Sequence, residues 1–241
     1  MKIQLFLILV LSLSFLSCNE ESNPVYVNND GSLVLSGKVD NSNFDKIFSN
    51  SYSYSDSLSV CDSAEIKTDG SFNLIIPPPP ENRLFRYKPY NHISVINSDT
   101  TFFIDSVSIA DSNFKYIKVG LSAQTKATPH LIQYSMPLNL AKITTIGEYA
   151  KVGDYYISYY YSSTQTTIQG YYKWRVVASG LSRESITYYN INIKKGWNKI
   201  ITRYINDDDM KSIYVVNEIS ADEGDWIIGA TSSFSNMAAW F

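Results

Sequence analysis

Hydrophobic and polar residues alternate along most of the chain after residue 31, with the period of two that a half-buried β-strand requires. The clearest case is the stretch AEIKTDGSFNLIIPPPP, in which four apolar residues can point to one side: Ile66, Phe72, Leu74 and Ile76. Asp69 and Gly70 favour the positive φ angles of a tight turn, so the stretch predicts a β-hairpin. Pro77–Pro80 then end the second strand, because proline donates no amide hydrogen bond.

A similar alternation of apolar and polar residues is found after residue 146, with many more aromatic residues. The segments GDYYISYYYSS, TTIQGYYKWRVVASG, SITYYNINIKKGWNKIITRYI and SIYVVNEIS each predict a strand or a hairpin. Between residues 120 and 145, two isolated prolines and the loss of alternation predict a linker. We therefore expect an all-β fold with two antiparallel β-sandwich-like domains, over residues 32–119 and 146–241. The segment 120–145 could instead be a long loop that crosses a single sandwich.

The N-terminus follows a different pattern. A single lysine precedes an apolar run, Leu5–Leu16, that contains no acidic residue. The run is too short to cross the roughly 30 Å core of a bilayer comfortably, and it predicts a secretory signal peptide over residues 1–17. Phe15-Leu16-Ser17-Cys18 resembles a bacterial lipobox, in which cleavage follows Ser17 and the Cys18 sulfur receives a diacylglycerol. Phe15 stands at the first lipobox position, where leucine is more usual.

Residues 18–31 predict a flexible tether, because they are rich in Asn, Glu and Ser. Asn19-Glu20-Glu21 is similar to the acidic tract after the lipidated cysteine of surface lipoproteins of the Bacteroidota. The resemblance implies a protein that is lipid-anchored in the outer membrane and exposed on the cell surface. A secreted protein with an incidental Cys18 is the alternative. Once Cys18 carries lipid, Cys61 has no cysteine partner, and we expect it to be a small apolar residue of a strand.

The N-terminal β region carries a second resemblance. LSGKV, near its start, and DGSFNL are similar to pieces of the transthyretin-like and carboxypeptidase-regulatory-like modules of bacterial envelope proteins. The resemblance implies a small sandwich that acts as a spacer or a docking unit.

The tyrosines of the second half fall into two sets when residues are counted in steps of two. If the isoleucines at 157, 168, 191 and 193 point inward, the tyrosines on their side are Tyr155, Tyr159, Tyr161, Tyr172 and Tyr189. The opposite face then carries Tyr156, Tyr160, Tyr171 and Tyr188, with Lys173, Arg175, Asn190 and Asn192. Flat rings can stack on the apolar face of a sugar, and amide and guanidinium groups can bond its hydroxyls. The candidate ligand-binding face is therefore Tyr156, Tyr160, Tyr171, Tyr188 and Arg175.

The tyrosine-rich face has two alternative roles that stay open. Tyrosine is a favoured strand residue whose ring tolerates partial exposure, so the pattern could be purely structural. The face could also pack against another domain or subunit.

Other chemistry is not indicated by the sequence. The formal net charge is −3 and no basic stripe is present, so we expect no nucleic-acid binding. His92 and His130 lack the companions of a zinc site, and NDDDM, residues 206–210, lacks the ligand spacing of an EF-hand and predicts a solvated turn. No phosphate loop, nucleophile elbow or dinucleotide fingerprint is present, so we predict no catalytic residue, no metal and no cofactor.

Together these features predict a non-catalytic binding or assembly module for a glycan or a partner protein, held to the membrane by its N-terminal lipid. One alternative is an envelope hydrolase that acts on glycan or peptide through two carboxylates in a cleft. Another is a structural spacer or subunit of a surface complex.

The expected anchor can be tested by Cys18→Ala, which removes the sulfur that would carry the lipid. Each buried methylene of an acyl chain contributes about 0.8 kcal/mol of membrane affinity. We expect the variant to leave the membrane fraction and to enter the aqueous phase in a detergent phase-separation assay. A variant that still follows the detergent phase contradicts the lipoprotein prediction.

Overall fold

The computed structural model describes residues 25–39, 43–51, 59–96, 99–125, 136–142, 151–178, 181–208, 211–218 and 225–228. Within these residues the chain is almost entirely β-strand, as the alternating pattern predicts, and the helical part is one short 3-10 turn, Glu81–Arg83. In this described part of the chain, no helix has the length and apolar character needed to cross a bilayer.

A small sheet has the order β1-β2-β5 and is antiparallel throughout. Its strands are β1 (Val25–Val27), β2 (Leu33–Lys38) and β5 (Ser71–Ile76). Burial alternates along β5 in the predicted way, because Phe72, Leu74 and Ile76 are buried and the residues between them are exposed. The strand ends directly before the proline run, where the sequence predicts its end.

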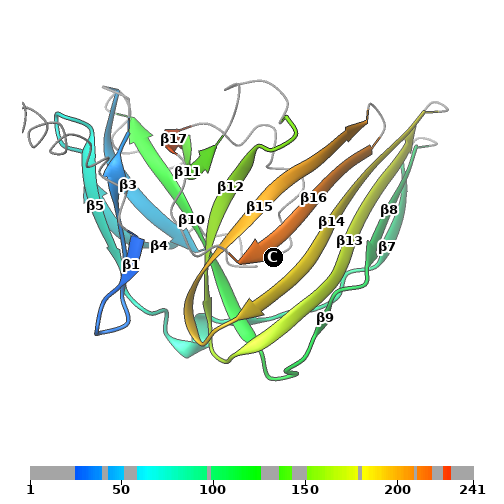
Figure 1. Cartoon of the computed structure of the whole chain (residues 1–241), viewed down its shortest axis with the longest axis horizontal. Coiled ribbons are helices and arrows are strands. Elements are labelled where there is room, and N and C mark those ends of the chain that lie inside the picture. The colour runs from blue at the N-terminus through cyan, green and yellow to red at the C-terminus, as the bar shows by residue number, and fades with distance from the viewer. Residues whose placement is uncertain are drawn as a thin grey trace, which may run out of the picture.

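A second, 14-stranded sheet contains the other described strands (Figure 1). They are β3 (Phe44–Ser51), β4 (Ser59–Glu65), β6 (Phe85–Arg86), β7 (His92–Ile96), β8 (Asp99–Asp105), β9 (Ser108–Ile109), β10 (Lys115–Thr125), β11 (Met136–Lys142), β12 (Tyr155–Ser162), β13 (Thr166–Ala178), β14 (Leu181–Ile193), β15 (Gly196–Asp208), β16 (Lys211–Glu218) and β17 (Asp225–Ile228). Its main path is β4-β3-β10-β11-β12-β15-β16-β14-β13-β8-β7, and the short strands β6, β9 and β17 pair with β10, β13 and β11.

One pair in this path, β14 with β16, is parallel. Only Lys194 and Lys195 separate β14 from β15 in the sequence, yet these two strands are not paired with each other. The next strand, β16, lies between them, antiparallel to β15 and parallel to β14. Four adjacent strands, β15, β16, β14 and β13, therefore form one continuous surface.

The turn predicted at Asp69 and Gly70 is present and is closed by two backbone hydrogen bonds, from Gly70 N to Lys67 O and from Lys67 N to Ser71 O, both at 2.9 Å, but the strands beyond it do not pair. Gly70 has a φ of +85°, and a Cβ there would lie 2.4 Å from the carbonyl oxygen of Val39, so the turn requires glycine. The strands on its two sides enter different sheets, since β4 pairs with β3 and β5 pairs with β2. The predicted turn is confirmed, but the predicted pairing of the two strands is wrong, because turn residues fix a change of direction whereas the core between the sheets decides which strands pair.

The two sheets enclose a first core, in the manner of a β-sandwich. Leu35 and Leu74 of the small sheet belong to the same buried cluster as Ile157 and Trp226 of the large sheet. The rings of Phe72 and Trp226 meet edge to face, with centroids 5.1 Å apart, in the geometry that aromatic pairs prefer.

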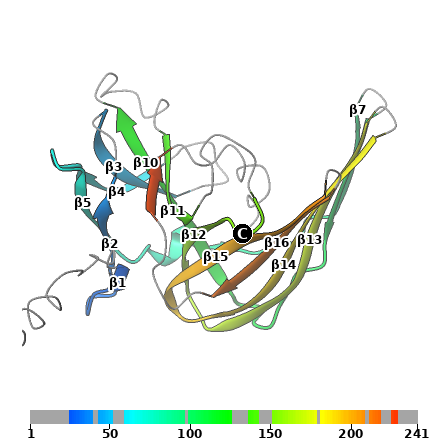
Figure 2. The ribbon, with the colours of Figure 1, turned by 45° about the horizontal axis from the view of Figure 1, so that its top comes forward.

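A second core lies in the other half of the large sheet, where strands β12 to β8 curve into a trough (Figure 2). It includes Tyr160, Tyr172 and Tyr189 together with Ile191 and Val216. The face of the sheet that carries this core is called the inner face, and the opposite face of β13 and β14 is called the outer face.

β12 contributes to both cores. Tyr155, Ile157 and Tyr159 belong to the first core, and Tyr160, on the opposite face of the strand, belongs to the second. The strand is therefore buried on both faces along most of its length. It joins the two halves of the molecule through packing as well as through hydrogen bonds.

The segment predicted as a linker, residues 120–145, contains parts of the large sheet. β10 runs through the predicted boundary at residue 119, and β11 lies inside the segment. β10 pairs with β3 on one side and with β11 and β12 on the other. The sheet is thus continuous between the two halves of the chain, and the first core draws residues from both.

Because β12 belongs to both cores, we expect the protein to unfold in one transition. Leu35 is fully buried, so Leu35→Ala should lower the free energy of unfolding by about 2–5 kcal/mol. Urea unfolding curves followed by tryptophan fluorescence and by near-ultraviolet dichroism should coincide and shift together.

The matched control is Val152→Ala, at a turn position that is 61% exposed. It should change the free energy by less than about 0.5 kcal/mol. Two separate transitions, of which Leu35→Ala moves only one, would show that the halves fold independently.

Candidate functional site

The structure divides the predicted ligand-binding face between two surfaces. Tyr171, Tyr188 and Arg175 lie on the outer face of β13 and β14. Tyr156 and Tyr160 are 7% and 6% exposed, and their side of β12 carries the second core. The expectation of one shared, exposed face is therefore wrong for Tyr156 and Tyr160.

The double burial of β12 explains this difference. Counting in steps of two is correct within each strand, and it correctly places Tyr172 and Tyr189 with the buried isoleucines of β13 and β14. In β12, however, Ile157 points into the first core and the alternate residues point into the second. An inward-pointing isoleucine therefore does not imply that the other face of its strand is exposed.

The inner face gathers an unusual number of phenol groups around one carboxylate. This inner cluster consists of Tyr87, Asp105, Tyr116, Tyr156, Tyr160, Tyr172 and Tyr189. The carboxylate of Asp105 accepts hydrogen bonds from the Tyr87 hydroxyl and from the backbone amides of Tyr90, at 3.1 Å, and Val107, at 3.0 Å. These three donors satisfy a charge that would otherwise be costly to bury.

Burial raises the pKa of five phenols of the inner cluster, because the phenolate would lose its hydration. The pKa of Tyr156 rises to about 12, and burial also raises the pKa of Tyr87, Tyr160, Tyr172 and Tyr189. Beside them, burial lowers the pKa of Lys118 to about 8, and its Nζ lies 5.7 Å from the ring centroid of Tyr160. The cluster is a packed and polar part of the core, in which these five phenols are neutral at pH 7.

The outer face of the β13–β14 ladder is accessible to solvent along most of its length, except at the buried Ile186 opposite Lys173, and it carries a different set of side chains. This outer platform consists of Thr167, Gln169, Tyr171, Lys173 and Arg175 of β13 with Glu184, Tyr188, Asn190 and Asn192 of β14. The register places Thr167 opposite Asn192, Gln169 opposite Asn190, Tyr171 opposite Tyr188 and Arg175 opposite Glu184. Polar amides, a tyrosine pair and charged groups therefore follow one another along the same two strands.

The amide end of the platform is held by cross-strand hydrogen bonds. Thr167 Oγ1 donates to Asn192 Oδ1 at 3.1 Å, and Gln169 Nε2 donates to Asn190 Oδ1 at 3.4 Å. The second bond leaves Gln169 Oε1 and Asn190 Nδ2 as an acceptor and a donor that a ligand could use. Asn217 of β16 is exposed and directly follows Val216, which lies beside the inward-pointing Tyr189, so Asn217 faces outward near the amide end.

The middle of the platform is aromatic. The ring centroids of Tyr171 and Tyr188 are 6.2 Å apart and their planes are tilted by 57°. Tyr188 is 42% exposed and Tyr171 is partly exposed, so both rings are accessible from the outer face.

The other end of the platform is charged. Arg175 Nε donates to Ser182 Oγ at 2.9 Å, which fixes the guanidinium group against the sheet. Glu184 forms ion pairs with Lys173 and, at 3.7 Å, with Lys211. The hydrogen bond from Lys173 and the nearby positive charges lower the pKa of Glu184, so it remains a carboxylate at neutral pH.

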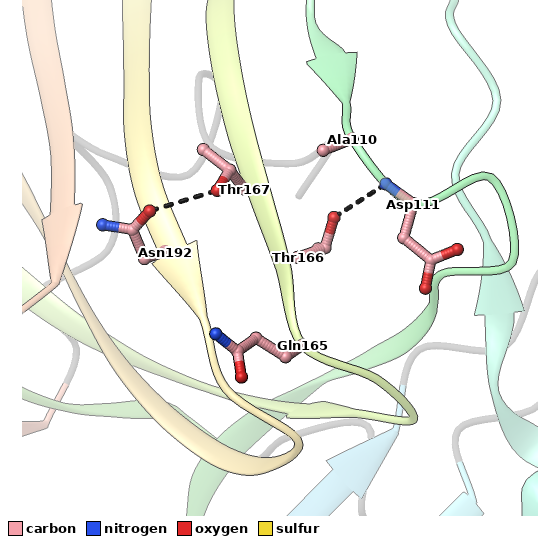
Figure 3. A pocket seen from close by; sticks show the side chains of 6 residues that line it. All are labelled: Ala110, Asp111, Gln165, Thr166, Thr167 and Asn192. Carbon is pink, nitrogen blue, oxygen red and sulfur yellow. Dashed lines mark hydrogen bonds between the residues drawn. The ribbon is translucent and has the colours of Figure 1, made fainter.

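An open hollow of about 470 Å³ adjoins the amide end of the platform (Figure 3). Its lining residues are Ala110, Asp111, Gln165, Thr166, Thr167 and Asn192. Figure 3 shows Thr166 directed toward Asp111, whose backbone amide donates to Thr166 Oγ1 at 3.0 Å. The hollow is lined mainly by hydroxyl, amide and carboxyl groups, which suits a ligand rich in hydroxyls.

The carboxylates of this surface are not placed for glycoside hydrolysis. Asp111 lies at the hollow beside Asn192, whereas Glu184 is eight positions away along β14, or about 26 Å in a strand. The two carboxyl groups of a glycosidase lie about 5–10 Å apart. Asp111 and Glu184 are therefore too far apart to act together as the carboxylate pair of a glycosidase.

Several predicted features lie outside the described residues. They are Ser17, Cys18, His130 and the end of the NDDDM segment. Cys61 lies in β4. His92 begins β7, is exposed, and has its ring 5.7 Å from that of Tyr90. Among the described residues, no three His, Cys, Asp or Glu side chains gather closely enough to hold a metal ion.

The sequence reasoning missed Gln169 and the hollow. Gln169 is two residues before Tyr171 in β13 and so lies on the same face. Counting in steps of two could therefore have identified Gln169. The hollow could not be found in this way, because it forms where Ala110 and Asp111 meet β13, far along the chain.

Comparison of the chain with models of known protein families, with curated proteins and with solved structures found no match. No residue role is therefore transferred from another protein.

The raised pKa values of the inner cluster predict a loss of stability at alkaline pH. The folded state favours the neutral phenol, so the contribution of each tyrosine is fully present below its unfolded pKa of about 10 and is lost as the pH rises toward its folded value. We expect the Tm to fall steeply between about pH 10 and 12. Lys118 has the opposite effect. Because burial lowers its pKa, its contribution to the free energy of unfolding rises with pH between about 8 and 10.5.

Tyr156→Phe keeps the buried ring and removes one titrating hydroxyl. It should make the fall in unfolding free energy between pH 10 and 12 smaller by about 2–3 kcal/mol, which corresponds to a pKa shift of about two units. Tyr26→Phe, at an exposed position of β1, should leave the slope unchanged. Equal slopes for the wild type and Tyr156→Phe would contradict the assignment.

Proposed function

We propose that the protein is a non-catalytic binding module of the cell envelope, anchored in the outer membrane through Cys18, and that it binds a glycan along the outer platform. The observation that carries this proposal is the order of groups on the platform. Amides, two accessible tyrosine rings and cations follow one another on a single exposed ladder.

The chemistry of each group suits a sugar polymer. The ring faces of Tyr171 and Tyr188 can pack against the apolar face of a sugar, and the amides of Gln169 and Asn190 can bond its hydroxyls. Same-face positions of a strand repeat about every 6.6 Å, so the stretch from Thr167 to Arg175 spans about 26 Å. A surface of this length fits an extended chain better than a small ligand.

The rigidity of the ladder also favours binding. β13 and β14 are paired along all of their 13 residues, so the side chains of the platform are held on a fixed backbone before a ligand arrives. Little backbone ordering then opposes association. Shallow sites of this kind bind weakly one at a time, and many copies anchored on one membrane surface would raise the overall affinity for a polymer.

We expect the tyrosine pair to dominate binding. With the chain lacking residues 1–18, affinity electrophoresis in gels that contain starch, mannan, xylan or pectin should show retardation by at least one polysaccharide. Two aromatic contacts of about 0.5–1.5 kcal/mol each predict that Tyr171→Ala with Tyr188→Ala weakens binding about tenfold or more.

The control is Tyr26→Ala, at an exposed tyrosine of the small sheet. It should leave both retardation and Tm unchanged, and the platform variant should leave the Tm nearly unchanged. Absence of retardation on every polysaccharide would overturn the glycan proposal. Unfolding of the double variant would show that these two tyrosines are structural.

A further inference from the structure

β7 is the last strand on the main path of the large sheet. On one side it pairs with β8, from His92 beside Phe103 to Ile96 beside Asp99. On its other side no described strand is paired with it. Figures 1 and 2 place β7 at the far rim of the trough. Half of its backbone amides and carbonyls therefore point away from the sheet.

Within the residues that the structure describes, this edge lacks the features that usually prevent pairing with another chain. Natural sheets protect such edges with lysine, proline, a β-bulge or a covering loop or helix. The sequence of β7, HISVI, contains no lysine or proline, and its register with β8 continues without a bulge. No charged carboxylate or ammonium group lies within the strand.

The outer face of the edge is apolar as well as accessible. Ile93 and Val95 are 63% and 67% exposed, and Ile104 of β8 is also among the exposed large apolar residues. Ile93 lies opposite Phe102, so these residues form one patch at the rim of the sheet. Exposed β-branched residues beside free backbone groups favour the addition of another strand.

We propose that two copies of this chain pair antiparallel through β7 and form a symmetric dimer with one continuous sheet. A two-fold axis through Ser94 sets Ile93 of each copy opposite Val95 of the other, on the same face. Cross-strand pairs of β-branched residues stabilise antiparallel sheets. Since the strand carries no fixed charge, the two copies do not repel each other at matched positions.

A second copy suits this edge because it supplies an equally uncharged strand and an equal apolar patch. The axis runs perpendicular to the sheet, so the exposed patches of Ile93, Val95 and Ile104 from both copies merge on one side. The two outer platforms then also face the same side, and a long ligand could reach both. The dimer does not depend on the glycan proposal, because it requires only the edge and the patch.

The contact is small, so we expect a weak dimer. Sedimentation velocity on the chain lacking residues 1–18 should show reversible dimers as the concentration is raised to about 1 mM. Ile93→Lys with Val95→Lys should raise the dissociation constant at least tenfold, because two pairs of like charges would face each other. Val152→Lys, at an equally exposed apolar position in a turn, should leave it unchanged.

A cysteine at the proposed axis tests the geometry directly. Antiparallel partners have Cα atoms about 4.5–5.5 Å apart, which is within the range that a disulfide spans. Ser94→Cys should therefore form a disulfide-linked dimer on mild oxidation, whereas Ser108→Cys, exposed on β9, should not under the same conditions. A chain that stays monomeric at about 1 mM, or that links equally well through both cysteines, overturns the proposal.

Discussion

β12 lies between the two cores, so most of its side chains must pack into one core or the other. Its sequence, YYISYYYS, meets this requirement mainly with tyrosine. A tyrosine ring fills as much space as phenylalanine and ends in a hydroxyl that can find a polar partner at the edge of a core. This choice lets one strand hold the small sheet on one face and the inner cluster on the other. The two halves of the molecule cannot be separated without exposing a buried face of β12.

The same constraint explains why only some of the tyrosines can meet a ligand. Those of the inner cluster are part of the core, where Tyr87 donates a hydrogen bond to Asp105. Once the inner face of β13 and β14 is buried in this way, their alternate residues are directed to solvent. Tyr171 and Tyr188 are accessible because Tyr172 and Tyr189 are not.

Local periodicity was sufficient for the β class, for the alternation of β5 and for placing Tyr171 and Tyr188 on the same face. These depend on neighbours in sequence or on a hairpin with a short connection. The partners of β4 and β5, and the burial of Tyr156 and Tyr160, depend on which sheet covers which face. Such contacts join distant parts of the chain, as does the 55-residue separation of Asp111 and Thr166 at the hollow. Alternation shows that a strand has two faces, but it does not show how many of them are covered.

The position of β16 has a consequence for how the chain folds. β14 and β15 are joined by two residues, and such neighbours close into a hairpin at the lowest cost in chain entropy. In the finished sheet β16 occupies the place between them. A β14–β15 hairpin formed early would have to open again before β16 could enter, whereas an early β15–β16 hairpin could add to β14 as a unit. The order in which these hairpins form thus decides whether the chain reaches the native sheet directly or passes through a trap.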